Sequence, residues 1–352
     1  MTATMGSPGL PAAKPGEVSI ELVNRADVMA RVSHALARAT LRPALDKVAD
    51  LAQRGPLRGT PAFRIANAVE LVTVALRAPR GTRRRPLRFP DFRAEWLWHK
   101  DIAAPEDTGQ GVILYFHGGG FVTGGLHSHR RLAARIANAS GVPLLNVDYR
   151  QLPKAHITET VVDALTAYRY LLEQGFSPER IVFAGDSAGG GLAFAAALAA
   201  RDGGLPVPGG IATIAPWADL DPALRHAHPN NAKDALLSAF SLSIPALTGF
   251  ARDGALVAAW SPVNHDFSGM PPVFIQVGAQ EVLLADAELL VRRCAESGVP
   301  CTLQIWDKAI HVFHAGADIL PDARAAIRQL AEFNRAIVGN HPLPVLGRDH
   351  AA

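Results

Sequence analysis

Cysteine, targeting signals and long apolar runs are scarce or missing in this 352-residue sequence. It has two cysteines, Cys294 and Cys301, and neither belongs to a Cys-x-x-Cys motif, so a disulfide-stapled secreted scaffold is excluded and two free, buried thiols are predicted. Residues 1–16 lack a basic segment followed by an apolar one, and no run of about 18 apolar residues could cross a membrane. We therefore expect a cytoplasmic protein without a membrane span.

Signatures of phosphate, nucleic-acid and metal binding are missing as well. The glycine-rich stretch 118–125 contains no G-x-x-x-x-G-K-S/T, and Thr123 stands where the third glycine of G-x-G-x-x-G would be. Arginines cluster at 77–88 without an aromatic platform or a recognition helix, which predicts a solvated, flexible connection and no nucleic-acid partner. His311 and His314 lack the HExxH spacing, so neither a metal nor an organic cofactor is expected.

Charged residues are few, at 19% of the chain, whereas hydrophobic residues make up 49%, and the formal net charge is +3. This composition indicates a well-buried globular core in one large α/β domain with an accessory part, or in two modest domains. Apolar runs predict strands at 93–98, 112–116, 143–147, 181–184, 211–214, 273–277 and 302–306. Helix-length segments lie at 128–140, 158–174, 187–201, 286–297 and 322–338. Their alternation predicts an α/β fold with a mostly parallel central sheet flanked by helices.

Two regions lack this alternation of strands and helices. Before residue 80 the apolar residues recur at helical spacing, which predicts helical segments, the third of them at 65–76, and no strands, with the sheet beginning near Phe89. Residues 219–267 combine loop signals with apolar helical pieces, which predicts an insertion between two strands. We divide the chain into an N-terminal helical cap segment and linker at 1–85 and a core at 86–352, with 219–267 as a cap insertion.

A possible nucleophile lies in Gly185-Asp186-Ser187-Ala188-Gly189, between an apolar run and an alanine-rich helical segment. The G-x-S-x-G pattern is typical of a sharp strand-to-helix turn, where close backbone approach leaves no room for side chains at the two glycines. Ser187 would stand exposed above the sheet, and the N–H of Ala188 would face a developing oxyanion. Alone, the pattern also fits a glycine-rich turn with a capping serine.

Three further loops supply partners for this serine. His117-Gly118-Gly119-Gly120-Phe121 follows a predicted strand, and successive glycines leave N–H groups unobstructed for an oxyanion hole. Glu281 and His311 follow two later strands, at the sheet edge where ligands bind in parallel sheets. The chain order serine, acid, histidine is that of α/β-hydrolases, which favours catalysis over a structural role for these residues.

Through these motifs the sequence resembles the hormone-sensitive-lipase-like family of α/β-hydrolase esterases, also called bacterial HSL or family IV esterases, over about residues 86–338. The resemblance implies the α/β-hydrolase fold with a helical cap. It also implies Ser187 as nucleophile and His311 as base, with Gly119, Gly120 and Ala188 as oxyanion-hole donors. It is carried by the segments 117–120, 185–190, 148–150, 216–220 and 261–262, which are HGGG, GDSAGG, DYR, PWADL and SP.

The sequence departs from the family pattern in two places. After Arg150 it continues with Gln151-Leu152-Pro153 where the family usually has Ala-Pro-Glu, so the pocket edge there is expected to differ. The acid position, usually aspartate, is Glu281, which leaves Asp286 as the alternative acid. Glu281 is favoured because it lies in the turn directly after a strand, whereas Asp286 stands where the N-cap of the next helix is expected.

The predicted function is hydrolysis of short- to medium-chain acyl esters by a Ser-His-acid triad through an acyl-enzyme intermediate. Phe121 and Trp217 are the expected substrate-binding residues, and the expected partner is a small-molecule acyl ester, with a homodimer held open. The alternatives are a non-catalytic ligand-binding module on the same fold, as in the plant gibberellin receptors, and a hydrolase of amides, carbamates or thioesters. The presence of His311 favours an enzyme over a receptor.

Overall fold

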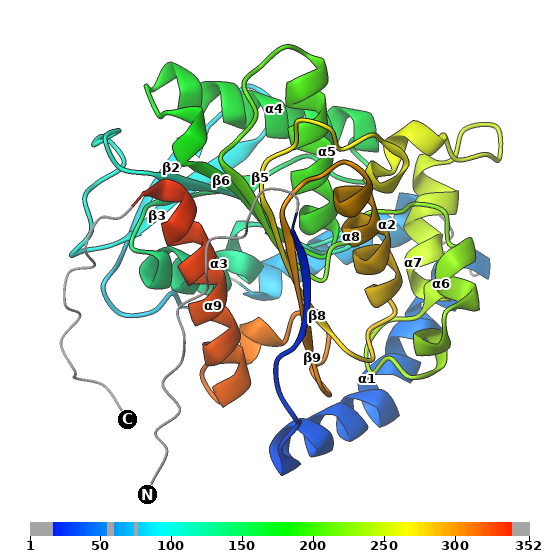
Figure 1. Cartoon of the computed structure of the whole chain (residues 1–352). Coiled ribbons are helices and arrows are strands. Elements are labelled where there is room, and N and C mark those ends of the chain that lie inside the picture. The colour runs from blue at the N-terminus through cyan, green and yellow to red at the C-terminus, as the bar shows by residue number, and fades with distance from the viewer. Residues whose placement is uncertain (1–16, 55–59, 74–76, 340–352) are drawn as a thin grey trace, which may run out of the picture.

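A computed structural model describes residues 17–54, 60–73 and 77–339 (Figure 1). Two sequence-based expectations lie outside these residues, namely the absence of a secretion signal in 1–16 and the end of the helical run near Leu76. No helix of the described part is long and apolar enough to cross a membrane. Cys294 and Cys301 are free and buried, as expected.

The centre of the molecule is a nine-stranded sheet in the order β1-β9-β8-β7-β6-β4-β5-β3-β2. Strand β3 pairs antiparallel with both β2 and β5, and all other pairs are parallel. This confirms the mostly parallel sheet, and the seven predicted strands match β3 to β9 within two residues at each end. The strands are β1 (Val18–Leu22), β2 (Thr82–Arg88), β3 (Arg93–His99), β4 (Val112–Phe116), β5 (Leu144–Asp148), β6 (Ile181–Asp186), β7 (Gly210–Ile214), β8 (Val273–Gly278) and β9 (Cys301–Trp306).

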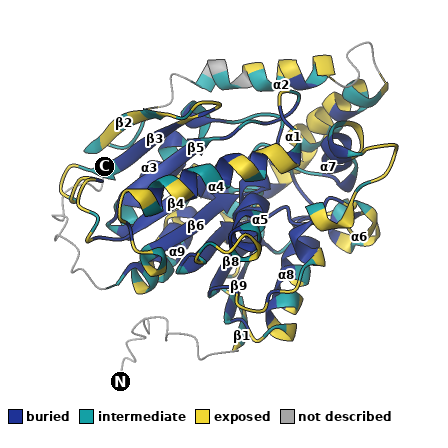
Figure 2. Ribbon diagram, turned by 90° about the horizontal axis from the view of Figure 1, so that it is seen from above, coloured by how far each residue is buried: buried dark blue, intermediate teal, exposed yellow. Residues whose placement is uncertain are grey.

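Helices cover both faces of this sheet. In Figure 1, α3 and α9 lie on one face, while α4, α5 and α8 lie on the other. Strands β4 and β6 are buried along their whole length, as expected for strands covered on both sides (Figure 2). The helices are α1 (Val28–Arg54), α2 (Thr60–Val72), α3 (Leu126–Ser140), α4 (Ile157–Glu173), α5 (Ala188–Asp202), α6 (Ala223–Ala227), α7 (Ala239–Pro245), α8 (Leu284–Glu296) and α9 (Pro321–Val338).

The expectation of an N-terminal part without strands is wrong. Strand β1 forms one edge of the sheet and pairs parallel with β9, with Val18 opposite Cys301 and Leu22 opposite Ile305. Its five residues, Val-Ser-Ile-Glu-Leu, alternate between apolar and polar, a short strand pattern that the helical interpretation of this region overlooked, and their partner strand lies at the other end of the chain. A local sequence pattern could not show this pairing, because backbone hydrogen bonds to a distant strand produce it.

The arginine-rich stretch is also not a flexible connection. Arg83, Arg84 and Arg85 lie on β2, the opposite edge strand, and pair with Trp98, Leu97 and Trp96 of β3. The sheet therefore begins before Phe89. Charged side chains at an edge strand are a common protection against pairing with other chains, so a polar composition did not exclude a strand here.

Residues 219–267 contain short helices without a strand, as expected for an insertion between β7 and β8. Besides α6 and α7 they include η3 (Pro229–Ala232), a π-helical turn η4 (Ala246–Phe250), η5 (Ala258–Trp260) and η6 (Pro262–Asn264). This segment packs against α1, where the Arg42 guanidinium donates to the carbonyl oxygens of Asn231, Asp234 and Leu237 over 2.7–3.1 Å. Two further polar contacts join α1 to the insertion: Arg38 Nη2 donates to the carbonyl of Ala232 at 2.6 Å, and Asp46 Oδ1 accepts from Ser238 Oγ at 2.5 Å.

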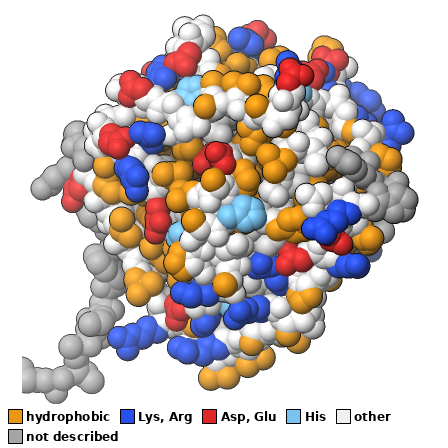
Figure 3. Space-filling view, turned by 90° about the vertical axis from the view of Figure 1, so that its right-hand side faces the viewer, with side chains coloured by type: hydrophobic (Ala, Val, Ile, Leu, Met, Phe, Trp, Pro, Cys, Tyr) orange, Lys and Arg blue, Asp and Glu red, His pale blue; other side chains and the backbone are white. Residues whose placement is uncertain are grey.

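Helix α1 is continuous through Pro43 and exposes much of its apolar surface. Val28, Val32 and Leu36 are 78%, 59% and 62% exposed. The face on which α6 and α7 lie shows hydrophobic side chains scattered among charged ones (Figure 3). The N-terminal segment, residues 17–73 of the described chain, thus differs from the sheet core in how little of it is buried.

Candidate active site

Ser187 occupies the sharp turn between β6 and α5. Its φ of 54° and ψ of −122° place a non-glycine residue in a strained backbone conformation, and its N–H donates to the carbonyl of Ile214 at 2.8 Å. A Cβ added at Gly189 would overlap the backbone oxygen of Phe116, and one at Gly185 would overlap that of Gly189. The glycines therefore have the close-approach role that the sequence predicted, and Ala188 begins the helix.

The loop after β4 turns back over the elbow. Gly119, Gly120 and Phe121 have φ values of 117°, 63° and 60°. Within the described residues, the N–H groups of Gly119 and Gly120 donate to no protein acceptor. Free N–H groups on a loop beside a nucleophile are what an oxyanion hole requires.

Asp186, directly before the serine, joins the elbow to this loop. Its carboxylate accepts from Tyr115 Oη at 2.6 Å and from the N–H of Gly118 at 3.1 Å, and it lies 3.4 Å from His129 Nε2. Burial alone would raise the pKa of Asp186, but the charge and hydrogen bond of His129 lower it to about 2, so the carboxylate is ionised. The sequence analysis missed His129, which carries no motif of its own.

Glu281 and His311 meet above the ends of β8 and β9. Glu281 Oε2 lies 2.6 Å from His311 Nδ1, while its Oε1 accepts from the N–H of Gly278 at 2.7 Å. Burial would lower the pKa of His311, but the charge and hydrogen bond of Glu281 raise it above its usual value. The carboxylate therefore fixes the imidazole with Nδ1–H toward the acid and leaves Nε2 as the proton acceptor.

Asp286 does not cap its helix, contrary to the sequence-based expectation. Helix α8 begins at Leu284, and Asp286 lies inside the first turn, fully buried. Its carboxylate accepts from the N–H groups of Ala218 and Asp219 at 3.0 and 2.8 Å and from the equally buried Arg225 at 3.0 Å. The N-cap role expected for Asp286 is therefore wrong, and the sequence could not show its pairing because Arg225 comes from the insertion.

Phe121 and Trp217 lie together in a buried aromatic cluster. The Phe121 ring centroid is 5.7 Å from that of Trp217 and 5.7 Å from that of Phe250. The backbone N–H of Trp217 donates to the carbonyl of Ser187 at 2.8 Å, so the cluster adjoins the turn that carries Ser187. Phe121 and Trp217 are each at most 2% exposed, which makes this a closed, apolar surrounding.

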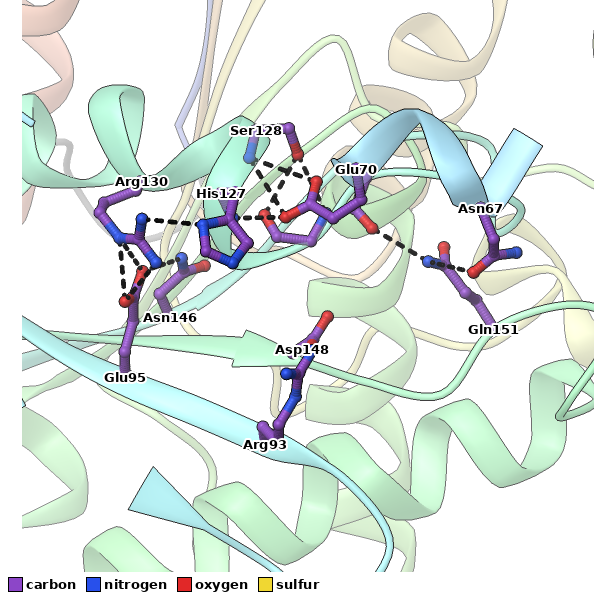
Figure 4. Close-up of polar contacts among 12 residues, drawn as sticks. Asn67, Glu70, Arg93, Glu95, His127, Ser128, Arg130, Asn146, Asp148 and Gln151 are labelled. Carbon is purple, nitrogen blue, oxygen red and sulfur yellow. Dashed lines mark hydrogen bonds and ion pairs between the residues drawn. The ribbon is translucent and has the colours of Figure 1, made fainter. Parts of the chain in front are cut away.

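Helix α2 holds the glycine loop from outside the core (Figure 4). Asn67 Nδ2 donates to the carbonyls of Val122 and Leu152 at 2.8 and 2.7 Å. The Glu70 carboxylate accepts from the backbone N–H groups of His127 and Ser128, the first turn of α3. A carboxylate at that position satisfies unpaired N–H groups and the positive end of the helix dipole.

The insertion supports the acid turn in a similar way. Asn230 Nδ2 donates to the carbonyls of Ala279 and Glu281 at 3.0 and 2.9 Å, and Asp234 Oδ2 accepts from the N–H of Val282 at 2.7 Å. No sequence motif indicated these two residues. They fix the backbone on both sides of Glu281, and hence its reach toward His311.

A serine on a strained strand-to-helix turn, with a carboxylate–imidazole pair above later parallel strands, is the arrangement of an α/β-hydrolase. Residues 113–315 match the sequence profile of a family described as having the alpha/beta hydrolase fold. The chain belongs to this family, and its relatives place it among the bacterial hormone-sensitive-lipase-like esterases.

Named relatives and solved structures agree with that placement. The chain is 38% identical to an acetyl-hydrolase of Streptomyces hygroscopicus, over 70% of this chain and 80% of the relative. It is 37% identical to the esterase LipU of Mycobacterium tuberculosis, over 73% and 88%. A crystal structure of an esterase from the bacterial hormone-sensitive lipase family has a TM-score of 0.73 and 32% identity, covering 84% of this chain and 99% of that one. The structure of EstE5 soaked with p-nitrophenyl butyrate has a TM-score of 0.76 and 32% identity, over 88% and 99%.

Proposed function

We propose that this esterase cleaves short- to medium-chain acyl esters through Ser187, His311 and Glu281. The observation that carries the proposal is the 2.6 Å contact between Glu281 and His311 at the same edge of the parallel sheet as Ser187, whose φ is 54°. A hydrogen-bonded acid and imidazole above neighbouring strands orient a base, and the strained turn presents the nucleophile. A site that only binds a ligand needs neither an oriented imidazole base nor a serine on a strained turn, so the two features together support catalysis.

In the first half of the reaction, Ser187 Oγ attacks the ester carbonyl carbon while His311 Nε2 takes its proton. The resulting oxyanion is stabilised by the N–H groups of Gly119, Gly120 and Ala188. His311 then returns the proton to the departing alkoxide, so an alcohol leaves and an acyl-enzyme remains. In the second half, water gives a proton to His311 and attacks the acyl carbon. The bond between that carbon and Ser187 Oγ then breaks, His311 returns the proton to Oγ, and the carboxylic acid leaves.

The aromatic cluster supports the preference for short acyl chains. Phe121 and Trp217 are the proposed substrate-binding residues, and with Phe250 they occupy the space beside Ser187 that a long acyl chain would need. We further propose that the helices within residues 1–85 and the 219–267 insertion form a cap over the core at 86–352. A cytoplasmic location and a homodimer stay predictions from the sequence.

Initial rates on 4-nitrophenyl esters from two to twelve acyl carbons test the proposal, with Ser187→Ala and His311→Ala as blanks. We expect turnover on the two- to six-carbon esters, a steep fall beyond them, and loss of turnover by at least about 10³-fold in both blanks. Normal circular dichroism with retained turnover in Ser187→Ala would overturn the serine mechanism. Faster turnover of the twelve-carbon ester than of the four-carbon ester would overturn the chain-length preference.

A further inference from the structure

The loop that carries His311 is strained on both sides of the histidine. Lys308 and Val312 have φ values of 54° and 53°, a region that L side chains rarely adopt and that is especially unfavourable for the β-branched valine. Such conformations persist only where the surroundings hold them. The contacts that hold residues 307–313 therefore determine where His311 stands.

The start of this loop is held by the chain segment just after β1. Asn24 Oδ1 accepts from the N–H of Asp307 at 2.7 Å, and Asn24 Nδ2 donates to Asp322 Oδ2 at 2.7 Å. The N–H of Ala26 donates to Asp307 Oδ2 at 3.1 Å. One asparagine thus joins the end of β9 to the first turn of α9.

The end of the loop is held by a row of side chains across the sheet. Glu21, Gln304 and Gln276 are register partners on β1, β9 and β8. Gln304 Nε2 donates to Glu21 Oε2 at 3.0 Å, Gln276 Nε2 donates to Gln304 Oε1 at 2.8 Å, and His314 Nε2 donates to Gln276 Oε1 at 2.9 Å. Each amide orients the next side chain in the row. The row therefore connects β1 to His314, three positions after His311.

Apolar packing holds part of this loop, since Phe313 is buried and its ring centroid lies 5.5 Å from that of Trp306. A cavity of about 30 Å³ lies between the start of α1 and the loop, lined by Ala30, Ser33, Lys308, Ile310 and Phe313 among others. On the side of this pocket, the polar contacts of residues 21–26 add to the constraint on the loop.

We propose that Asn24 is a positioning residue for His311: it holds the strained loop in the geometry in which the imidazole serves Ser187. The inference rests on the proposed function of His311. A displaced base lowers the rate of the chemical step without removing the groups that bind substrate, so kcat falls while KM stays nearly constant.

The main test measures kcat and KM for 4-nitrophenyl acetate, with sites counted by complete fluorophosphonate labelling of Ser187. For Asn24→Ala we expect kcat per labelled site to fall about 10-fold, with KM within about twofold of the parent. Asn264→Ala is the control, because Asn264 is an asparagine whose side-chain amide also donates a hydrogen bond, to the carbonyl of Ala258, but it is exposed and lies in the insertion. It should leave kcat unchanged.

A second test exchanges the hydrogen-bond donor and acceptor between Asn24 and Asp322. It distinguishes a loss of positioning from a general loss of structure. Asn24→Asp places two carboxylates together and should lower kcat, whereas Asn24→Asp combined with Asp322→Asn restores both hydrogen bonds and should recover kcat to within about twofold. Unchanged kcat per site in Asn24→Ala, a loss seen only in the number of labelled sites, or no recovery in the exchange variant would each overturn the inference. Retained turnover in His311→Ala would instead overturn the proposed function.

Discussion

In the sheet core, Leu114 on β4 is fully buried, whereas in the N-terminal segment Leu36 on α1 is 62% exposed. The core is held by dense apolar packing around β4 to β8. The N-terminal segment is held by individual polar side chains, among them Asn24, Arg42 and Asn67, each of which donates to or accepts from a distant part of the chain. Truncating an apolar side chain should therefore harm the core, and removing a polar one should harm the attachment of the N-terminal segment.

The largest difference between the two regions should be in kcat after a Glu→Gln substitution. Glu281→Gln removes the negative charge beside His311, and we expect kcat to fall by about 10³- to 10⁴-fold, as on loss of a triad carboxylate. Glu70→Gln removes a charge at the N-terminus of α3 and should cost about 0.3–1 kcal/mol of stability with kcat changed by less than about 10-fold. Steady-state kinetics and thermal unfolding of both variants check this. Comparable losses of kcat in the two variants would show that the charge on α2 matters for catalysis as much as the charge beside His311.

Two aspartates sharpen the comparison for stability. Asp286→Ala leaves the buried Arg225 guanidinium without its carboxylate, and breaking such a pair typically costs about 3–5 kcal/mol. Asp27→Ala removes an exposed carboxylate that accepts from the N–H of Ala30 at the start of α1, which should cost about 1 kcal/mol. Chemical denaturation measures both. An Asp286→Ala variant as stable as Asp27→Ala would contradict the assigned role of the ion pair.

Truncating a leucine should also lower the stability of the protein more in the sheet core than in the N-terminal segment. Leu114→Ala opens a cavity beneath the active site and should cost about 2–5 kcal/mol. Leu36→Ala, on an exposed helical surface, should change stability by less than about 0.5 kcal/mol. A cost above about 2 kcal/mol for Leu36→Ala would mean that another surface covers α1 in solution, and the oligomeric state would then be the next measurement.

The pH dependence should be the subtlest difference. Burial would lower the pKa of His311, but Glu281 raises it, so kcat/KM should rise with pH through a midpoint above 6.5 as the neutral base forms. The buried His34 of α1 has a pKa lowered by burial, so any ionisation of that residue would appear below 6.5. A pH profile with a midpoint below 6.5 would contradict the Glu281–His311 coupling.

The sequence was informative wherever function depends on short local motifs. The turn at Ser187 and the glycine loop at 118–120 could be placed because the backbone needs particular residues there. The acid turn at Glu281 followed from its position after an apolar strand. Each of these signals lies within a few residues of the feature that it predicts.

Contacts between distant segments could not be predicted in the same way. Arg225 and Asp286 pair over 61 positions, and neither residue has a neighbour that marks the pair. Strand β1 contributes five residues whose partner is known only once the fold exists. His129 next to Asp186 and Asn230 next to Glu281 also depend on tertiary packing. The sequence therefore indicated the central residues of the candidate site but not the residues that hold them in place.

The pairing of β1 with β9 also has a consequence for biosynthesis. Asn24 and Asp307 are 283 positions apart, so a ribosome makes nearly the whole chain before their contact can form. The elbow and the glycine loop are complete much earlier, since β4 and β6 precede β9. Such non-local pairing forms slowly, because the entropy of a long chain segment is lost before the stabilising contacts are made. The nascent chain consequently contains the turn at Ser187 long before the contacts that hold the loop of His311 can form.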